Sequence, residues 1–279
     1  MLGQRVITAV ALLALLLPAL FAESLVPFAL LTVLMISAAG WEWGRLNGLS
    51  MGKSLALGAA VGASCVLAWR AGWATAAPPA AWWVACGCWV LGGSAALRAG
   101  PAAWPRLSRG ARLWVGWLVL SVAWLALAAA KSRGVGFILS ALCLVWMADI
   151  AAYFGGRAFG RRKLAPSISP GKSWEGVWSG MVGVGLLSVG WMAAESAGFL
   201  VGPPSLFLVI RGNMGWIGLL LAIVFLCALS VMGDLVESLA KRAVGAKDSS
   251  RLLPGHGGVL DRVDALLPAL PAAMALASL

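Results

Sequence analysis

Long apolar runs separated by short charged segments constrain this chain more than any other feature of its sequence. Most of the runs approach the roughly 20 residues that an α-helix needs to cross the hydrocarbon core of a bilayer. The sequence therefore predicts an all-α fold, a polytopic integral membrane bundle of about nine transmembrane helices. The predicted spans are residues 6–22, 25–39, 54–69, 81–97, 113–130, 134–153, 176–196, 213–233 and 265–279.

The distribution of Lys and Arg predicts how these helices are oriented. With the N-terminus in the cytoplasm, only four of the 21 basic residues fall in outer segments, namely Arg70, Lys131, Arg133 and Arg211. Cytoplasmic loops carry such an excess of positive charge in membrane proteins generally. The formal net charge of +11 is therefore explained by orientation, and we expect no binding to nucleic acid.

Polar and charged residues that could bind a substrate or a metal concentrate in the second half of the chain. We expect residues 1–140 to form an N-terminal transmembrane scaffold, in which Glu42 and Arg45 are simple loop charges. Residues 141–279 are expected to form a C-terminal catalytic region with cytoplasmic loops at 154–175 and 234–264. The apolar segment 199–210 contains two prolines and is about half a span long, which favours an interfacial turn or a re-entrant piece.

The segment 238–264 holds five of the 21 basic residues, three of the ten acids and the only histidine. Charge inside hydrocarbon is costly, so this segment must lie in water or line a wet cavity. Asp234, Glu237, Lys241 and Asp248 recur at helical spacing. This pattern predicts a helix that continues until the Pro-Gly pair at 254–255.

Glycines and acids follow that predicted helix. Gly257 and Gly258 permit positive φ and let backbone amides approach a phosphate. Asp261 and Asp264, three residues apart, would lie on one side of a helical turn. With Asp234 they would suit a divalent cation such as Mg²⁺, which takes oxygen ligands together with substrate phosphates. Alternatively, Asp234 is a helix-end charge or a partner for Lys241.

The single histidine, His256, has no Cys or His partner for an ordinary zinc site. We expect it to donate to a phosphate or to orient its loop.

Two further groups of polar residues precede that segment. Asp149 lies in an apolar run with Tyr153 four residues on and Arg157 beyond, so it either pairs with a neighbouring cation or faces a cavity. Residues 161–163 are basic, and residues 166–176 contain serines that can donate to phosphate oxygens. Taken alone, this second group could also be a positive-inside loop.

In identity and spacing these segments resemble the signature of the phosphatidate cytidylyltransferases, the CDP-diacylglycerol synthases. The matching positions of the last segment are Ser238, Lys241, Arg242, Lys247, Asp248, Pro254, His256, Gly257, Gly258, Asp261, Arg262 and Asp264. The runs around Asp149 and from Ser169 to Gly176 are similar to two further motifs of the family. Ala240 and Gly171 depart from the residues usual there, a larger aliphatic and a basic residue.

The resemblance implies a nucleotidyltransferase that converts CTP and phosphatidate to CDP-diacylglycerol and pyrophosphate in phospholipid biosynthesis. It implies Mg²⁺ held by Asp234, Asp261 and Asp264, with a second, monovalent or divalent, cation as an option. The implied catalytic residues are Asp234, Lys241, Arg242, His256, Asp261 and Asp264. The implied substrate-binding residues are Asp149, Tyr153, Arg157, Ser169, Lys172, Ser173, Glu175, Glu237, Ser238, Lys247, Asp248, Gly257, Gly258 and Arg262.

The same resemblance implies a bacterial inner membrane location, with the site facing the cytoplasm, and it suggests a homodimer. Two alternatives stay open at this point. A related CTP-dependent lipid enzyme, such as a CDP-archaeol synthase or a polyprenol kinase, would differ in its lipid acceptor or in the phosphorus attacked. An ion-coupled transporter would instead use Asp149 and Asp234 to line an ion path.

Overall fold

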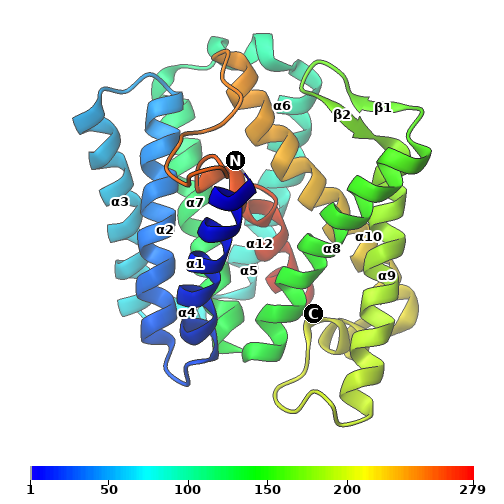
Figure 1. Cartoon of the computed structure of the whole chain (residues 1–279). Helices are drawn as coiled ribbons and strands as arrows, with labels where there is room; N and C mark the ends of the chain where they lie inside the picture. The colour runs from blue at the N-terminus through cyan, green and yellow to red at the C-terminus, as the bar shows by residue number, and fades with distance from the viewer. Residues whose placement is uncertain (1) are drawn as a thin grey trace.

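The computed structural model describes residues 2–279 and consists of long helices packed side by side (Figure 1). Their apolar composition supplies the surfaces that pack against each other and against lipid. The first half contains α1 (Leu2–Phe21), α2 (Leu25–Leu46), α3 (Met51–Arg70), α4 (Trp73–Ala76), α5 (Pro79–Cys88), a π-helical turn η1 (Trp89–Gly93), α6 (Ser94–Ala99), a 3₁₀ turn η2 (Pro101–Arg106) and α7 (Arg109–Ser132).

The second half contains the long helices that carry most predicted site residues. It comprises α8 (Val135–Phe159), the strands β1 (Lys163–Ala165) and β2 (Ser169–Ser173), α9 (Trp174–Ser196), α10 (Leu206–Ala243), α11 (Leu260–Val263) and α12 (Leu266–Leu276). The two strands form one antiparallel hairpin. An all-α membrane protein is thereby confirmed, with this hairpin as its one small sheet within residues 2–279.

Seven helical segments in the described chain are long and apolar enough to span a membrane, the third being the continuous stretch Pro79–Ala99. The first and last of the nine predicted spans correspond to α1 and α12. α1 contains the apolar stretch Val10–Phe21, and α12 has only 11 residues. A count of nine crossings and a cytoplasmic N-terminus stay predictions.

Close backbone contact explains how neighbouring helices pair. A Cβ atom at Gly180 of α9 would lie 2.8 Å from the carbonyl oxygen of Ala148 on α8, so only glycine permits this approach. Small residues at helix contacts are usual in membrane bundles. One buried apolar cluster joins helices from both halves of the chain, including Phe28 on α2, Ile138 on α8 and Leu270 on α12.

The two ends of the bundle differ in chemistry. Figure 1 shows the ends of α2 and α10, the hairpin and α6 together at the top, and the connections α1–α2 and α9–α10 at the bottom. The top therefore gathers the segments predicted to be cytoplasmic. The segment predicted as an interfacial turn is irregular until Ser205 and then enters α10, which is kinked at Gly215.

Two predicted boundaries are wrong. Residues 154–159, expected in a loop, are the last helical residues of α8. Arg157 lies in the final turn, where the helix dipole stabilises a cation. The helix expected to continue to Pro254 ends at Ala243. Gly245 there has a φ of 70°, a left-handed conformation that ends helices, so Asp248 is not on the face of Asp234 and Lys241.

The charged segment after α10 descends into the bundle. In Figure 1 it runs from the top to the level of the N-terminal end of α1, where the hydroxyl of Thr8 donates to the carbonyl of Pro254 at 3.0 Å. The chain then enters α11 and α12 from this lower level. α12 is short because the segment before it has already passed through part of the length of the bundle.

Candidate functional site

Polar side chains meet where α8, α10, the hairpin and the segment 244–264 come together. Lys172 at the end of β2 forms an ion pair with Asp234 on α10, with 2.5 Å between Nζ and Oδ2. The hydroxyl of Ser238, one turn further along α10, donates to Asp234 at 3.1 Å. Asp149 on α8 lies close enough to interact electrostatically with both Lys172 and Asp234. The hairpin, α8 and α10 therefore share one polar cluster.

A second cluster lies further along α10 around the buried amine of Lys241. This amine pairs with Glu237 on the same helix and with Asp261 at 2.6 Å. Glu237 is 3% exposed and Lys241 is 8% exposed. A buried cation requires such partners, because an unpaired charge away from water is strongly destabilising. The pairing with Lys241 ties α11 to α10.

The carboxylate of Asp261 is the best-satisfied acid of the site. Besides Lys241, it accepts the backbone N–H of Gly258 at 2.8 Å and both the N–H and the hydroxyl of Ser249 at 3.0 Å. Burial alone would raise the pKa of Asp261, but the hydrogen bonds from Lys241 and Gly258 outweigh it and hold the pKa at about 2. Asp261 is therefore fully ionised at neutral pH.

Asp264 has the opposite electrostatic environment. Burial, together with the neighbouring carboxylate of Asp234, raises the pKa of Asp264 to about 7. Its backbone carbonyl packs directly on Gly233 of α10, which leaves no room for a Cβ atom there. Asp264 thus lies within electrostatic range of Asp234, and the nearby amines of Lys241 and Lys172 offset this repulsion only in part.

This carboxyl pair fits a divalent cation. Mg²⁺ usually binds one or two carboxylates and takes its remaining oxygens from water and substrate phosphates. Within residues 2–279 no three acidic, His or Cys side chains are grouped as a metal site, so Asp234 and Asp264 would need such additional ligands. Asp261 would join them only by giving up hydrogen bonds to Lys241, Ser249 or Gly258.

Several predicted site residues support the backbone in this structure. Glu175 accepts the N–H groups of Arg161 and Arg162, and Ser173 caps α9 by accepting the N–H of Gly176. These contacts fix the base of the hairpin.

Two further predicted residues, both arginines, hold the segments around the site. Arg242 donates to the carbonyls of Ile168 and Ala246, at 3.2 Å each, and Arg262 donates to the carbonyl of His256 at 2.7 Å. Arg242 thereby joins the hairpin turn to the end of α10.

The glycines act differently from the prediction. Gly257 has the expected positive φ of 85°, whereas Gly258 does not. The amide of Gly258 points at Asp261, so it is not free for a phosphate in this arrangement.

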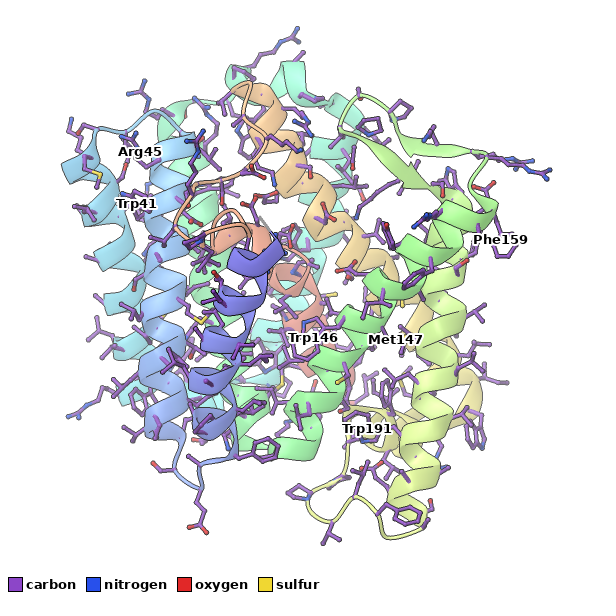
Figure 2. The ribbon with its side chains drawn as sticks, in the orientation of Figure 1. Trp41, Arg45, Trp146, Met147, Phe159 and Trp191 are labelled. Carbon is purple, nitrogen blue, oxygen red and sulfur yellow. The ribbon has the colours of Figure 1, made fainter. Side chains whose placement is uncertain are left out.

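Other predicted residues lie at the surface around the clusters. The side chains of Tyr153, Arg157, Lys247, Asp248 and Arg262 are exposed, and Ser169 is half-buried at the start of β2. A cavity of about 790 Å³ adjoins the segment 244–250 and is also lined by Trp41, Arg45, Asn47 and Arg112. Figure 2 shows Trp41 and Arg45 near the upper end of α2.

One residue of the site was missed by the sequence analysis. Glu42, expected as a loop charge, lies inside α2 and is completely buried beneath the segment 249–260. That prediction is wrong, and Arg45 is likewise helical, in the last turn of α2. The available signal was an acid inside a helix that is otherwise apolar, since a charge there requires a specific partner.

The fold and this site define a polytopic membrane protein with an ionic centre at one end of its bundle. The model of the cytidylyltransferase family matches residues 3–279, so the chain belongs to that family and is a nucleotidyltransferase.

Among its relatives is a phosphatidate cytidylyltransferase of Pseudomonas aeruginosa, 39% identical over 282 residues, which covers 99% of this chain and 97% of the relative. A Haemophilus influenzae protein of the same name is 50% identical over 139 residues, 50% of this chain and 44% of that protein. One from Brucella suis is 48% identical over 126 residues, 45% of this chain and 41% of that protein.

Proposed function

We propose that the protein transfers the cytidylyl group of CTP to phosphatidate, giving CDP-diacylglycerol and pyrophosphate, in the bacterial inner membrane. The observation that carries this proposal is the meeting of Asp234, Asp264, Lys172 and Lys241 at one end of a helical bundle. Family membership and the names of the relatives supply the substrates.

The reaction needs alignment more than activation of a nucleophile. The phosphate monoester of phosphatidate is already anionic and attacks the α-phosphorus of CTP, while the bond from that phosphorus to the bridging oxygen of pyrophosphate breaks. Two polyanions must approach each other, so cationic side chains are required. Lys172 is placed to contact a phosphate by exchanging its partner Asp234, and the exposed Arg157, Lys247 and Arg262 are further candidates.

Asp234 and Asp264 are the proposed ligands of Mg²⁺, with Asp261 as a third ligand once it exchanges its hydrogen bond from Lys241 for the ion, while Ser249 and Gly258 keep holding it. The bound ion would neutralise phosphate charge and stabilise the leaving pyrophosphate. Ser238 orients Asp234, and Lys241 keeps Asp261 close to α10. We further propose that residues 1–140 serve as scaffold apart from Glu42, that the charged end faces the cytoplasm, and that the protein forms homodimers.

The test is pyrophosphate release by purified protein in detergent with phosphatidate, Mg²⁺ and CTP. We expect release only when both CTP and phosphatidate are present, and none with ATP or without lipid. A polyprenol kinase would release CDP instead of pyrophosphate, and an archaeal-type ether lipid acceptor would restore activity to a CDP-archaeol synthase. Absence of any CTP turnover in folded protein would contradict the transferase and favour the transporter.

A further inference from the structure

Glu42 lies in a transmembrane helix and has no exposed surface. A carboxylate in that setting is costly unless donors compensate its charge. No described Lys or Arg side chain pairs with it. The compensation comes from hydrogen bonds, all donated by one segment far away in the sequence, residues 249–260.

Both ends of that segment bind the same carboxylate. At one end, the hydroxyl of Ser250 donates to Glu42 at 2.5 Å and that of Ser249 lies at 3.3 Å. At the other end, the backbone N–H groups of Val259 and Leu260 donate at 3.0 and 2.7 Å. Glu42 therefore closes this segment into a loop, which we call the signature loop.

The signature loop also holds Asp261. Ser249 lies between the two carboxylates, with its hydroxyl oxygen 3.0 Å from Asp261 and 3.3 Å from Glu42. A hydroxyl has one proton, so Ser249 serves one carboxylate at a time. The N–H of Gly258, which also donates to Asp261, directly precedes the two amides bound by Glu42. Any movement of Glu42 is thus passed to two donors of Asp261.

The residue at 258 shows how closely these groups fit. A Cβ atom there would overlap both the hydroxyl of Ser249 and the carboxylate of Glu42. Close packing therefore requires a glycine at position 258, independently of any contact with a phosphate.

We propose that Glu42 is a positioning residue for the transfer reaction. It touches no substrate, and it fixes Ser249 and Gly258 so that they hold Asp261 against Lys241. The inference rests on the proposed function for its kinetic consequence, whereas the ordering of the signature loop can be measured without any substrate.

The first experiment compares Glu42→Gln with wild type by amide hydrogen exchange in detergent, without nucleotide or metal. A glutamine offers one acceptor oxygen in place of two and turns an N–H₂ group toward donors, so at least one buried hydrogen bond is lost. We expect exchange of the Val259 and Leu260 amides to rise about tenfold. Exchange in α8 and in the first half of α10 should stay unchanged.

The second experiment measures kcat and KM for CTP and phosphatidate on the same samples, normalised to monodisperse protein. We expect kcat to fall about tenfold or more with KM changed less than about threefold, because ground-state binding does not use Glu42. Glu23→Gln is the matched control, since Glu23 is an exposed acid in the connection that precedes α2, far from the end of α2 that carries Glu42, and it should behave as wild type.

Ser250→Ala is the second variant, because it removes one donor and leaves the carboxylate in place. It should produce the same local pattern with a smaller effect. Coupling provides a further check: Glu42→Gln and Ser249→Ala together should cost less than the product of their separate effects, because both act through Asp261.

Each result decides the proposal. Unchanged exchange and kcat in Glu42→Gln would overturn it, as would faster exchange throughout the protein, which would make Glu42 a residue of general stability. Faster exchange limited to the loop with normal kcat would also overturn it. If wild type fails to use CTP and phosphatidate, the proposed function fails, while local exchange still reports whether Glu42 holds the loop.

Discussion

At the scale of single residues, the acids of the site differ because their surroundings differ. Asp261 has donors on both oxygens and a pKa of about 2, whereas burial, together with the carboxylate of Asp234, raises the pKa of Asp264 to about 7. Sequence spacing placed these two aspartates together as equivalent ligands. Their roles separate only when the hydrogen-bond donors around each are known.

We predict that Asp261→Asn lowers turnover by about 100-fold or more while the protein still inserts into the membrane. The N–H₂ group of the asparagine would face the N–H donors of Ser249 and Gly258, so hydrogen bonds would be lost. Lys241 would also lose one of its two carboxylate partners, which is destabilising for a buried cation. Pyrophosphate release measures turnover, and the yield of monodisperse protein measures folding. Activity close to wild type would contradict a role for Asp261.

Gly258→Ala should lower kcat about tenfold or more, because the added methyl group overlaps Ser249 and Glu42. Gly171→Ala is the matched control, since a Cβ atom there has no neighbour within 4 Å. Both variants are compared by kcat and by thermal unfolding midpoint. Equal behaviour of the two would show that the close packing at 258 has no consequence for the reaction.

At the scale of elements, two contacts join the hairpin to α10, one from the end of β2 and one from the turn between the strands. Lys172 reaches Asp234, and Arg242 reaches the carbonyl of Ile168 in the turn. The pair of Lys172 and Asp234 is about a quarter exposed at each side chain, so its net contribution to stability is small, on the order of 1 kcal/mol or less. The ion pair matters because it holds the amine of Lys172 next to Asp234.

Lys172→Met is therefore expected to raise KM for a substrate about tenfold, with an unfolding midpoint close to that of wild type. Lys163→Met, on the neighbouring strand and exposed, is the control and should leave KM within about twofold. Steady-state kinetics with each substrate varied in turn identifies which phosphate is affected. A large loss of stability without a change in KM would assign Lys172 to folding alone.

Apolar length predicted the long helices well, because burial in lipid is a local requirement on about 20 successive residues. The ends of α8 and α10 were predicted less well. The single charge in the last turn of α8, Arg157, is typical of a loop, although the helix dipole also stabilises a cation at a C-terminal end. One glycine in a left-handed conformation ends α10 early. Contacts of Glu42 could not be predicted, since its donors lie more than 200 residues away.

At the scale of the whole molecule, the hairpin and the ends of α2 and α10 lie at one end of the bundle and the connections α1–α2 and α9–α10 at the other (Figure 1), and most Lys and Arg residues belong to segments of the first end. The signature loop enters the bundle from the charged end. Under the proposed function, substrate phosphates would arrive from the same side as the hairpin, and the acyl chains of the lipid substrate would remain in the bilayer beside the helices.

Cysteine labelling tests which side this is. After replacement of the exposed Cys88, Lys247→Cys should react with a membrane-impermeant thiol reagent only when cells are opened. Val201→Cys, 95% exposed at the opposite end, should react in intact cells. Labelling of Lys247→Cys from outside, with Val201→Cys protected, would reverse the proposed orientation.

The contact between Glu42 and Gly258 also limits how this protein can be recombined. A chimera that joins residues 1–140 of this chain to the remaining part of a relative would place the carboxylate of Glu42 against the relative's residue at position 258, where this chain has a glycine. Such a hybrid should work only where the donor and the recipient agree at both positions. The two halves are therefore expected to diverge as a matched pair, with substitutions near residue 42 accompanied by substitutions around residues 249–260.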